Sequence, residues 1–458
     1  MMGKQRILVM IAMQAYLRNW VQAGAFDELS KKYDVHFVVA KYDWDHAEIE
    51  NYGIKQYQVI SQGGYRKFLL RRLLTVTMFK HARISRAFRI KLLLVKPRMR
   101  LVYQFLSLPM LYEILLWAYG RLLPKWTEFS DVAKEIKPSL VMAPSLAADS
   151  FTIDMTYSAK KLGIKSLLLI NSWDNLVSKG VLPIPPDCLV VWGQQGINQA
   201  INLQKMPAEK VVPLGVPRFE SYYERSQRKS TGHIHAFNKI HEDKKIILYA
   251  ATSIPFDDVQ ALAILDRAIS SASLEYVILF RPHPEMMKRV GEVSVEECGF
   301  RNVYMDQQLA GYYASRFKSK AEDYPSYLNN AELSYYPELM KSISGMICPP
   351  TTLSLEGAIN GVPCLMICYG DGRNTWLSPD LVCQYENVEE ILRFPGIVPC
   401  YGEADLLECF RKLVAYSEDD DVRNKLVDAT RYVVYRDDKP YGKRLCNLVD
   451  KLLVPGNP

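Results

Sequence analysis

Three apolar runs between residues 244 and 361 constrain the fold of this chain more than any other feature. Small, hydroxyl-bearing or charged residues follow each run directly, and helix-like segments separate the runs. This alternation is typical of an open α/β sheet, in which ligands bind in the crevice outside the carboxyl ends of the strands. The runs are residues 245–251 before Thr252 and Ser253, 276–280 before Arg281 and His283, and 345–348 before Thr351 and Thr352. A nucleotide would fit at such strand ends.

Length and composition predict two globular domains. The chain has 458 residues, 49% of them hydrophobic and 23% charged, which suits two cores of ordinary size. A strand–helix–strand pattern at 6–12, 19–31 and 35–40 opens the first half. We therefore predict an α/β fold of two Rossmann-like, doubly wound domains facing a central cleft. The predicted segments are a first domain at 1–225 with a basic helical insertion at 61–125, a linker at 226–244, a second domain at 245–420 and C-terminal helices at 421–458.

Positive charge is concentrated in one stretch of the first half. No Asp or Glu occurs from residue 51 to 112, whereas thirteen Lys and Arg do, although the whole chain carries only +7. Lys80, Arg83, Arg86 and Arg89 recur at every third residue, so we expect them along one face of a helix. Basic amphipathic helices of this kind bind anionic membrane surfaces, and a solvated basic face is the alternative. Nucleic acid is not expected, because no RNA-binding or helix-turn-helix signature accompanies the charge.

The remaining signals favour a protein on the inner face of a cell membrane. The apolar run 7–13 is short and is followed by Gln14 and Arg18, so it predicts a first strand and not a signal peptide. The nine cysteines make no zinc-binding spacing, which favours reduced thiols in the cytoplasm. Residues 101–120 contain Pro109 and Glu113 near the middle, so we expect a buried or interfacial helix there and not a spanning one.

Five short motifs occur in order along the chain: 191–193 and 214–219 in the first half, and 281–284, 350–357 and 361–363 in the second. Together they resemble the GT-B superfamily of nucleotide-sugar glycosyltransferases. The resemblance extends over nearly the whole chain and is strongest to the bacterial surface-polysaccharide branch, which includes CDP-glycerol-type polymerases and transferases of CMP-activated acidic sugars. It implies that the first domain holds the acceptor and the second the nucleotide donor.

The donor site is predicted at the strand ends of the second domain. The flanking prolines fix the backbone of His283, and the resemblance implies that this imidazole contacts the nucleotide and that Arg281 pairs with phosphate. Hydroxyls at a helix N-terminus bind phosphate, which suggests a site at Thr351, although a plain helix cap is the alternative. The other predicted donor-binding residues are Thr352, Ser354, Glu356, Thr252 and Ser253, with Glu356 expected at the ribose hydroxyls.

The acceptor side is predicted in the first domain. Asp174 follows a strand of aliphatic residues, and a carboxylate there can accept the proton of an attacking hydroxyl. Asp149 is the rival candidate for this catalytic role, and Lys179 and Asn175 are expected to help bind the acceptor or an anion. A turn or helix-cap role for Asp174 is the alternative reading.

The sequence thus predicts a glycosyltransferase that moves a sugar from a nucleotide donor to a surface polysaccharide acceptor, which we expect to be lipid-linked. Neither a cofactor nor a metal is expected, and the phosphate-loop, dinucleotide-binding and hydrolase motifs are missing. Three alternatives remain. One is a transferase of polyol phosphate from a CDP-alcohol, with His283 assisting catalysis; the others are a non-hydrolysing sugar-nucleotide epimerase and a non-enzymatic scaffold at a lipid surface.

Overall fold

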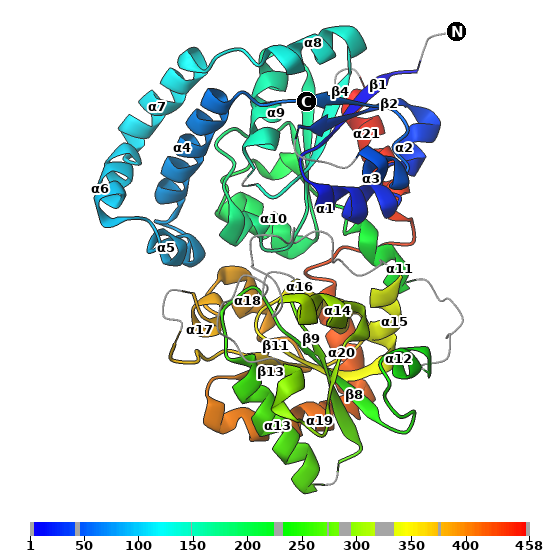
Figure 1. Cartoon of the computed structure of the whole chain (residues 1–458). Coiled ribbons are helices and arrows are strands. Elements are labelled where there is room, and N and C mark those ends of the chain that lie inside the picture. Colours follow the sequence, from blue (N-terminus) through cyan, green and yellow to red (C-terminus); the bar gives the residue numbers. More distant parts are fainter. Residues whose placement is uncertain are drawn as a thin grey trace. The chain divides into compact units, whose positions relative to one another are not determined.

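The computed structural model describes residues 4–41, 46–147, 149–223, 232–272, 274–283, 295–316, 334–373 and 377–454. The chain forms two compact units (Figure 1). The first comprises Met1–Glu220 and Arg431–Pro458, and the second comprises Ser221–Thr430. The C-terminal segment predicted at 421–458 is therefore divided between the two units. Of the predicted linker, residues 226–231 lie outside the described residues, and residues 232–244 belong to the second unit.

A parallel sheet of seven strands forms the core of the first unit. The strand order is β3-β2-β1-β4-β5-β6-β7, so the direction of winding reverses between β1 and β4. Strands β1, β4, β5 and β6 are almost entirely buried, as expected for parallel strands covered on both faces. The strands are β1 Arg6–Ile11, β2 Asp34–Ala40, β3 Tyr57–Ile60, β4 Leu140–Ser145, β5 Lys165–Ile170, β6 Cys188–Val191 and β7 Val211–Pro213.

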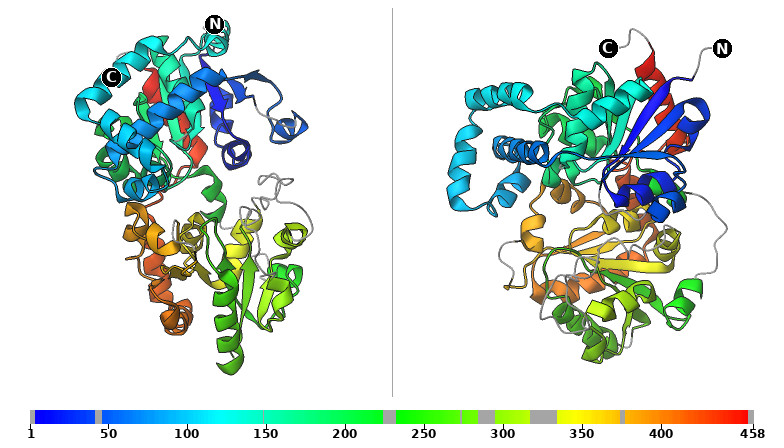
Figure 2. Two further views of the ribbon diagram at one scale, coloured as in Figure 1. Left: turned by 60° about the vertical axis from the view of Figure 1, so that its left-hand side comes forward. Right: turned by 45° about the horizontal axis from the view of Figure 1, so that its top comes forward.

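Helices cover both faces of this sheet (Figure 2). The prediction of one helix over 19–31 is wrong. A π-helical turn at Leu17–Gln22 ends before Gly24, whose φ of +72° breaks the helical path. The helices here, outside the insertion, are α1 Gln14–Tyr16, α2 Asp27–Lys32, α3 His46–Asn51, α8 Thr127–Ile136, α9 Ser150–Lys161, α10 Gln194–Asn202 and α21 Tyr441–Leu453.

The basic insertion consists of four helices: α4 Gly64–His81, α5 Arg86–Leu92, α6 Pro97–Leu106 and α7 Pro109–Leu122. The expected single helix through Lys80 and Arg89 is interrupted, because α4 ends at His81 and the Ser85 side chain caps α5 by accepting a hydrogen bond from the Phe88 amide. Arg83 lies in the turn, Arg86 and Arg89 lie on α5, and all three are exposed.

The stretch expected to form one helix over 101–120 is also broken, since Pro109 begins a new helix. Among the described helices, none is by itself both long and apolar enough to cross a membrane. Taken together, α6 and α7 meet that criterion by length and composition, with a bend of 86° between them.

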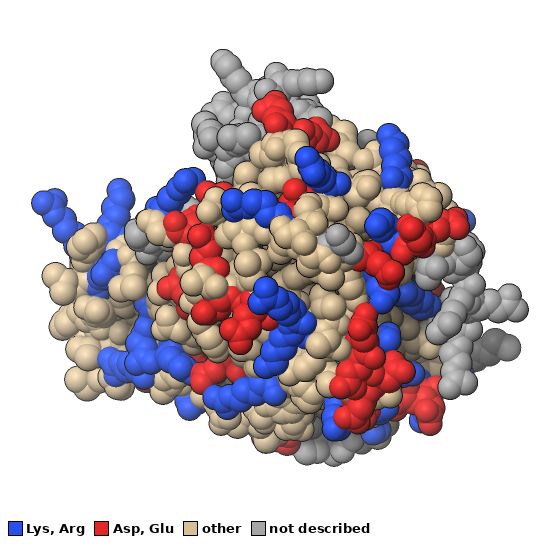
Figure 3. All heavy atoms as spheres, turned by 90° about the horizontal axis from the view of Figure 1, so that it is seen from below, with Lys and Arg blue, Asp and Glu red and all other residues tan. Residues whose placement is uncertain are grey.

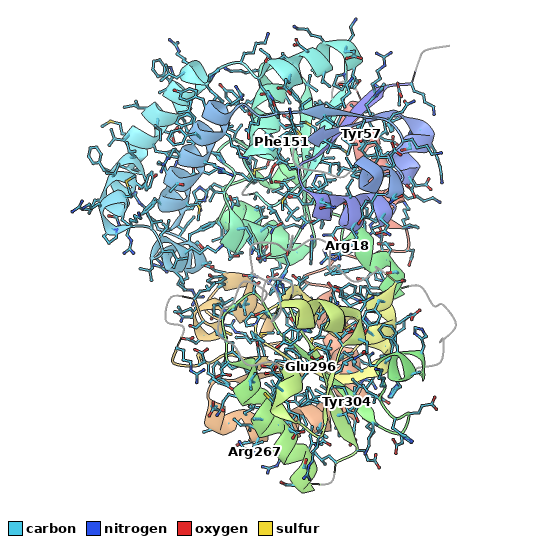
Figure 4. All side chains as sticks on the ribbon, viewed as in Figure 1. Arg18, Tyr57, Phe151, Arg267, Glu296 and Tyr304 are labelled. Atoms are coloured by element: carbon cyan, nitrogen blue, oxygen red, sulfur yellow. The ribbon has the colours of Figure 1, made fainter. Side chains whose placement is uncertain are left out.

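Buried contacts fix the insertion to the sheet domain. Arg66 of α4 forms a buried ion pair with Asp154 of α9, which also accepts a 2.8 Å hydrogen bond from Gln62. After α7, the Trp126 ring packs 5.2 Å from Phe151, which lies in the interior of the first unit (Figure 4). Breaking a buried charged pair typically costs about 3–5 kcal/mol, so the base of the insertion is held rigidly.

The chain returns to the first unit near residue 431, and two glycines make room for it. The Tyr435 amide donates a 2.7 Å hydrogen bond to the Trp192 carbonyl. A Cβ atom on Gly193 would lie 2.6 Å from the Val433 carbonyl oxygen, and one on Gly215 would lie 2.3 Å from that of Tyr435. The glycines in the motifs 191–193 and 214–219 therefore allow close approach of the returning backbone.

The second unit contains six parallel strands in the order β10-β9-β8-β11-β12-β13. They are β8 Lys245–Ala250, β9 Tyr276–Arg281, β10 Val303–Met305, β11 Ile343–Cys348, β12 Cys364–Ile367 and β13 Ile397–Cys400. The helices are α11 Glu220–Tyr223, α12 Gly232–Phe237, α13 Asp258–Ala272, α14 Gln307–Arg316, α15 Tyr335–Ser342, α16 Thr352–Ile359, α17 Pro379–Val382, α18 Glu386–Ile391, α19 Leu406–Ser417 and α20 Asp420–Thr430. The winding reverses between β8 and β11.

Candidate functional site

The point where the winding of the second sheet reverses brings two hydroxyl-rich turns to the same edge. Strands β8 and β11 pair in parallel, so their carboxyl ends are neighbours. Thr252 and Ser253 follow β8, and Thr351 and Thr352 follow β11. Ligands of open α/β sheets bind at this position. Both hydroxyl pairs that were predicted from the sequence therefore lie at the part of the sheet where a ligand is expected.

The N-terminus of α16 provides the more complete phosphate-binding arrangement. Thr351 has an extended backbone and caps the helix, accepting a 3.4 Å hydrogen bond from the Leu353 amide. Thr352 is the first helical residue, and both threonines are only partly buried. The positive end of a helix attracts phosphate oxygens, and hydroxyls there can donate to them.

Two other predicted donor-binding residues of α16 are bonded inside the protein. The buried Ser354 hydroxyl donates a 2.7 Å hydrogen bond to the Thr351 carbonyl. The Glu356 carboxylate, which is also buried, accepts a 2.5 Å hydrogen bond from the Tyr222 hydroxyl. These contacts hold the start of α16 in place, and the direct ligand contacts predicted for the two residues remain predictions.

The turn after β8 has one buried and one exposed hydroxyl. Thr252 is buried, and its side-chain oxygen accepts a 3.2 Å hydrogen bond from the Ile254 amide. Ser253 is exposed. Five residues after Ser253, Asp258 accepts a 3.0 Å hydrogen bond from the buried Tyr249 hydroxyl. Of the two predicted hydroxyls, only that of Ser253 is placed to meet a ligand from solvent.

The guanidinium of Arg281 is paired with a carboxylate that the sequence analysis did not single out. Asp306, directly after β10, is fully buried and forms an ion pair with Arg281. Arg281 also donates a 3.1 Å hydrogen bond to the Tyr336 hydroxyl, and Tyr335 donates a 3.0 Å bond to Asp306. This buried ion pair links the carboxyl ends of β9 and β10. His283 lies two residues beyond, half-buried at the end of the described segment.

In the first unit, the loop after β5 holds Asp174 in a polar cluster. Asp174 accepts a 3.2 Å hydrogen bond from Ser178 and lies 3.7 Å from the Lys179 ammonium. Asn175 is fully buried, and its side-chain oxygen accepts a 2.7 Å hydrogen bond from the Ser172 amide. Asn175 therefore shapes the loop, whereas Asp174 and Lys179 keep exposed side-chain surface.

Asp149, the rival candidate, caps helix α9. One carboxylate oxygen accepts a 2.8 Å hydrogen bond from the Thr152 amide, and the other accepts a 3.2 Å bond from the Leu146 amide. Burial raises the pKa of Asp149 above its ordinary value, although these bonds oppose the shift. Both oxygens of Asp149 thus bond to backbone amides, whereas Asp174 keeps exposed side-chain surface.

Lys91, on α5 of the insertion, is a residue near this loop that the sequence analysis did not identify. Helix α5 packs against the π-helical turn Asn175–Lys179. Burial lowers the pKa of Lys91 to about 8; the positive charge of Lys179 adds to this shift, and the negative charge of Asp174 opposes it. Lys91 therefore lies within electrostatic range of both Asp174 and Lys179. Lys91 is one of thirteen basic residues in its stretch, so no local signal distinguishes it.

A small pocket opens at the carboxyl ends of β5 and β6, next to the same loop. Trp173 and Trp192 form part of its wall, and the buried Gln199 amide nitrogen has no hydrogen-bond partner within the described residues. The described residues contain no group of three or more His, Cys, Asp or Glu side chains that would suit a metal ion.

Comparison with known proteins supports the fold assignment. Residues 197–304 match the family model described as CDP-glycerol:poly(glycerophosphate) glycerophosphotransferase. This match spans less than half of the chain and includes His283. No curated protein matches the sequence.

Three similar solved structures cover nearly the whole chain. UDP-GlcNAc 2-epimerase from Methanocaldococcus jannaschii has a TM-score of 0.53 and 12% identity, covering 97% of this chain and 99% of its own. The Neisseria meningitidis enzyme bound to UDP-GlcNAc has a TM-score of 0.52 and 13% identity, covering 98% and 100%. The calicheamicin glycosyltransferase CalG4 has a TM-score of 0.50 and 10% identity, covering 100% of both chains. The chain has the GT-B fold, and identities this low show the fold alone.

Proposed function

We propose that this protein transfers a sugar from a nucleotide-sugar donor to a lipid-linked surface polysaccharide at the cytoplasmic face of a membrane. The observation that carries the proposal is the pair of hydroxyl-rich turns where the winding of the second sheet reverses. Thr351 and Thr352, at the positive end of α16, hold the donor phosphates, with Ser253 and His283 at the neighbouring strand ends. No cofactor or metal takes part in this proposal.

The acceptor hydroxyl attacks the anomeric carbon of the donor, and the bond from that carbon to the phosphate oxygen breaks. The nucleotide leaves with the bonding electron pair, and Asp174 takes the hydroxyl proton. A carboxylate that keeps solvent access and a neighbouring ammonium can accept a proton and return it to water.

The family match supports a second candidate, transfer of polyol phosphate from a CDP-alcohol. In that reaction the acceptor hydroxyl attacks the phosphorus next to the alcohol, the P–O–P bond breaks, and CMP leaves. His283 lies inside the matched span and would assist the phosphoryl transfer. Two of the similar structures are epimerases. The experiment must therefore distinguish transfer to an acceptor from interconversion of free nucleotide sugars.

A donor panel tests the proposal on the purified full-length chain. Calorimetry with nucleoside mono- and diphosphates comes first, followed by product analysis with each donor in the presence and absence of a lipid-linked glycan. We expect acceptor-dependent nucleotide release, and we expect Thr351→Val together with Thr352→Val to weaken nucleotide binding at least tenfold. Thr75→Val is the matched control on α4. Absence of binding to every nucleotide would refute the proposal, and acceptor-independent interconversion of nucleotide sugars would identify an epimerase.

A further inference from the structure

The outer surface of the insertion is unusually apolar. The structure describes twenty large hydrophobic side chains that are exposed, and fourteen of them lie between residues 61 and 125. In Figures 1 and 2, α6 and α7 lie on the outside of α4 as the outermost helices on that side of the first unit. Scattered exposed apolar residues are normal, but this concentration on one insertion is typical of an interaction surface.

The exposed apolar residues follow the helical repeat. On α6 this holds for Leu101, Val102 and Phe105, and on α7 for Met110, Ile114 and Trp117; Met99 and Leu122 are exposed as well. Spacings of three and four residues place each set along one side of its helix. These six residues, which we call the apolar stripe, are between 49% and 75% exposed. An ordinary amphipathic helix turns such a face toward the core.

The opposite sides of both helices are already occupied. Tyr103 of α6 is buried, with its ring 5.6 Å from Phe79 of α4, and it accepts a hydrogen bond from Arg72. Tyr112 of α7 is buried and lies 2.9 Å from the Thr77 hydroxyl of α4. Side chains outside the apolar stripe therefore hold α6 and α7 on α4, and within the described residues the stripe stays exposed.

Charge identifies the partner. The insertion at 61–125 contains fourteen Lys and Arg but one acidic residue, Glu113, which is paired with Lys80 at 3.3 Å. Arg98 lies three residues before Leu101 on α6, and Arg121 lies four residues after Trp117 on α7; both are exposed. The left-hand edge of the view in Figure 3, which the insertion forms, shows Lys and Arg among uncharged atoms. Apolar side chains bordered by arginines suit a surface with an apolar interior and anionic headgroups.

We propose that the apolar stripe inserts into the headgroup region of an anionic bilayer, with the neighbouring arginines and lysines on the lipid phosphates. Two helix axes that meet at 86° define a plane, so α6 and α7 can both lie along one membrane surface. The exposed Arg83, Arg86 and Arg89 add electrostatic attraction, and the apolar stripe supplies the hydrophobic contact. The inference deepens the proposed membrane location but depends on no step of the transfer reaction.

Vesicle sedimentation of the full-length chain tests this surface. The vesicles contain either phosphatidylglycerol with phosphatidylcholine or phosphatidylcholine alone. We expect binding to the anionic vesicles, and we expect the triple change Leu101→Ser, Phe105→Ser and Trp117→Ser to lower the partition coefficient by about a hundredfold. The matched control is Leu162→Ser, Phe237→Ser and Tyr401→Ser, three exposed apolar residues outside the insertion, which should leave binding unchanged.

Trp117 offers an independent readout, because it is the one exposed tryptophan within the described residues. Vesicles with brominated acyl chains should quench part of the protein fluorescence, and Trp117→Phe should remove that part. Unaltered binding of the triple variant, or a dimer that only the triple change abolishes in sedimentation equilibrium, would overturn the proposal. Calorimetry with nucleotides on the same variants separates the two proposals, since failure of nucleotide binding in the unaltered protein would leave the vesicle result intact.

Discussion

Substitution of Arg281 separates a structural role from a ligand-binding role at the candidate donor site. The sequence predicts that this guanidinium pairs with a donor phosphate. The structure shows it buried and paired with Asp306, and both groups also contact tyrosine hydroxyls. Arg281→Met would leave the Asp306 carboxylate buried without its counter-charge. We therefore expect the main effect to be a loss of stability in the second unit.

The expected magnitude follows from the burial of both partners. Removing one member of a buried ion pair costs about 3–5 kcal/mol. For a unit of about 200 residues, each kcal/mol shifts the melting temperature by roughly 2–4 °C, so the transition of the second unit should fall by about 6–20 °C. Asp306→Asn keeps the oxygen that accepts from Tyr335 but removes the charge. Adding this change to Arg281→Met should cost little more, because the carboxylate is already unpaired.

Differential scanning calorimetry of the two single variants and the double variant measures this coupling, which we expect to exceed about 2 kcal/mol. Nucleotide binding is measured by titration calorimetry well below the lowered transition, and we expect it to fall less than tenfold. His283→Gln is the comparison variant, with unchanged melting and weakened binding. An Arg281→Met protein that melts like the unaltered chain but no longer binds nucleotide would refute the structural role and restore the phosphate contact.

Three further predictions address other parts of the fold. Lys91→Met should stabilise the protein at neutral pH: a fall in the pKa of Lys91 from about 10.5 to about 8 corresponds to about 3 kcal/mol. The unfolded chain keeps the Lys91 proton up to a higher pH than the folded chain does. The free energy of unfolding of the unaltered protein should therefore rise between about pH 8 and 10.5. Denaturant melts should show a smaller rise over this range in Lys91→Met. Thr351→Val should cost about 1 kcal/mol through loss of the helix cap, while Thr351→Ser keeps both stability and nucleotide affinity in melts and calorimetry. Gly193→Ala should destabilise the first unit by about 1–3 kcal/mol, because its Cβ would meet the Val433 carbonyl, whereas Gly64→Ala meets no atom within 4 Å and should be neutral in the same melts.

The strands that carry the candidate site could be predicted because parallel strands buried on both faces are continuous aliphatic runs. Strands β8 and β9 match the runs indicated at 245–251 and 276–280 to within one residue. The edge strand β3 was missed, because only one of its four residues is buried. The predictions of long helices at 19–31 and 80–89 were wrong, because Gly24 and Ser85 interrupt them. At these positions a left-handed glycine and a capping serine outweigh hydrophobic periodicity.

Contacts between distant segments could not be predicted from local patterns. The sequence shows a charged residue after β9 but not that Asp306, after the next strand, would neutralise it. Likewise, the sequence around Gly193 does not show that the backbone of Val433 packs closely against this glycine. The apolar stripe was expected to be buried or interfacial, and only the packing of Tyr103 and Tyr112 shows which side of each helix stays exposed. In each case the deciding partner lies on another element.

The insertion connects the proposed lipid surface to the proposed acceptor loop within a single unit. Helices α6 and α7 pack on α4, which continues through the Ser85 turn into α5, and α5 packs against the turn that begins after Asp174. Buried contacts at Arg66 fix the base of this assembly to α9. A bilayer held by the apolar stripe would therefore lie at a set distance from Asp174, because rigid packed helices link the two. A soluble acceptor would gain nothing from that link, whereas a lipid-linked one would be presented at a constant height. The proposed bilayer contact and the proposed lipid-linked acceptor are therefore consistent with each other, whatever the donor is.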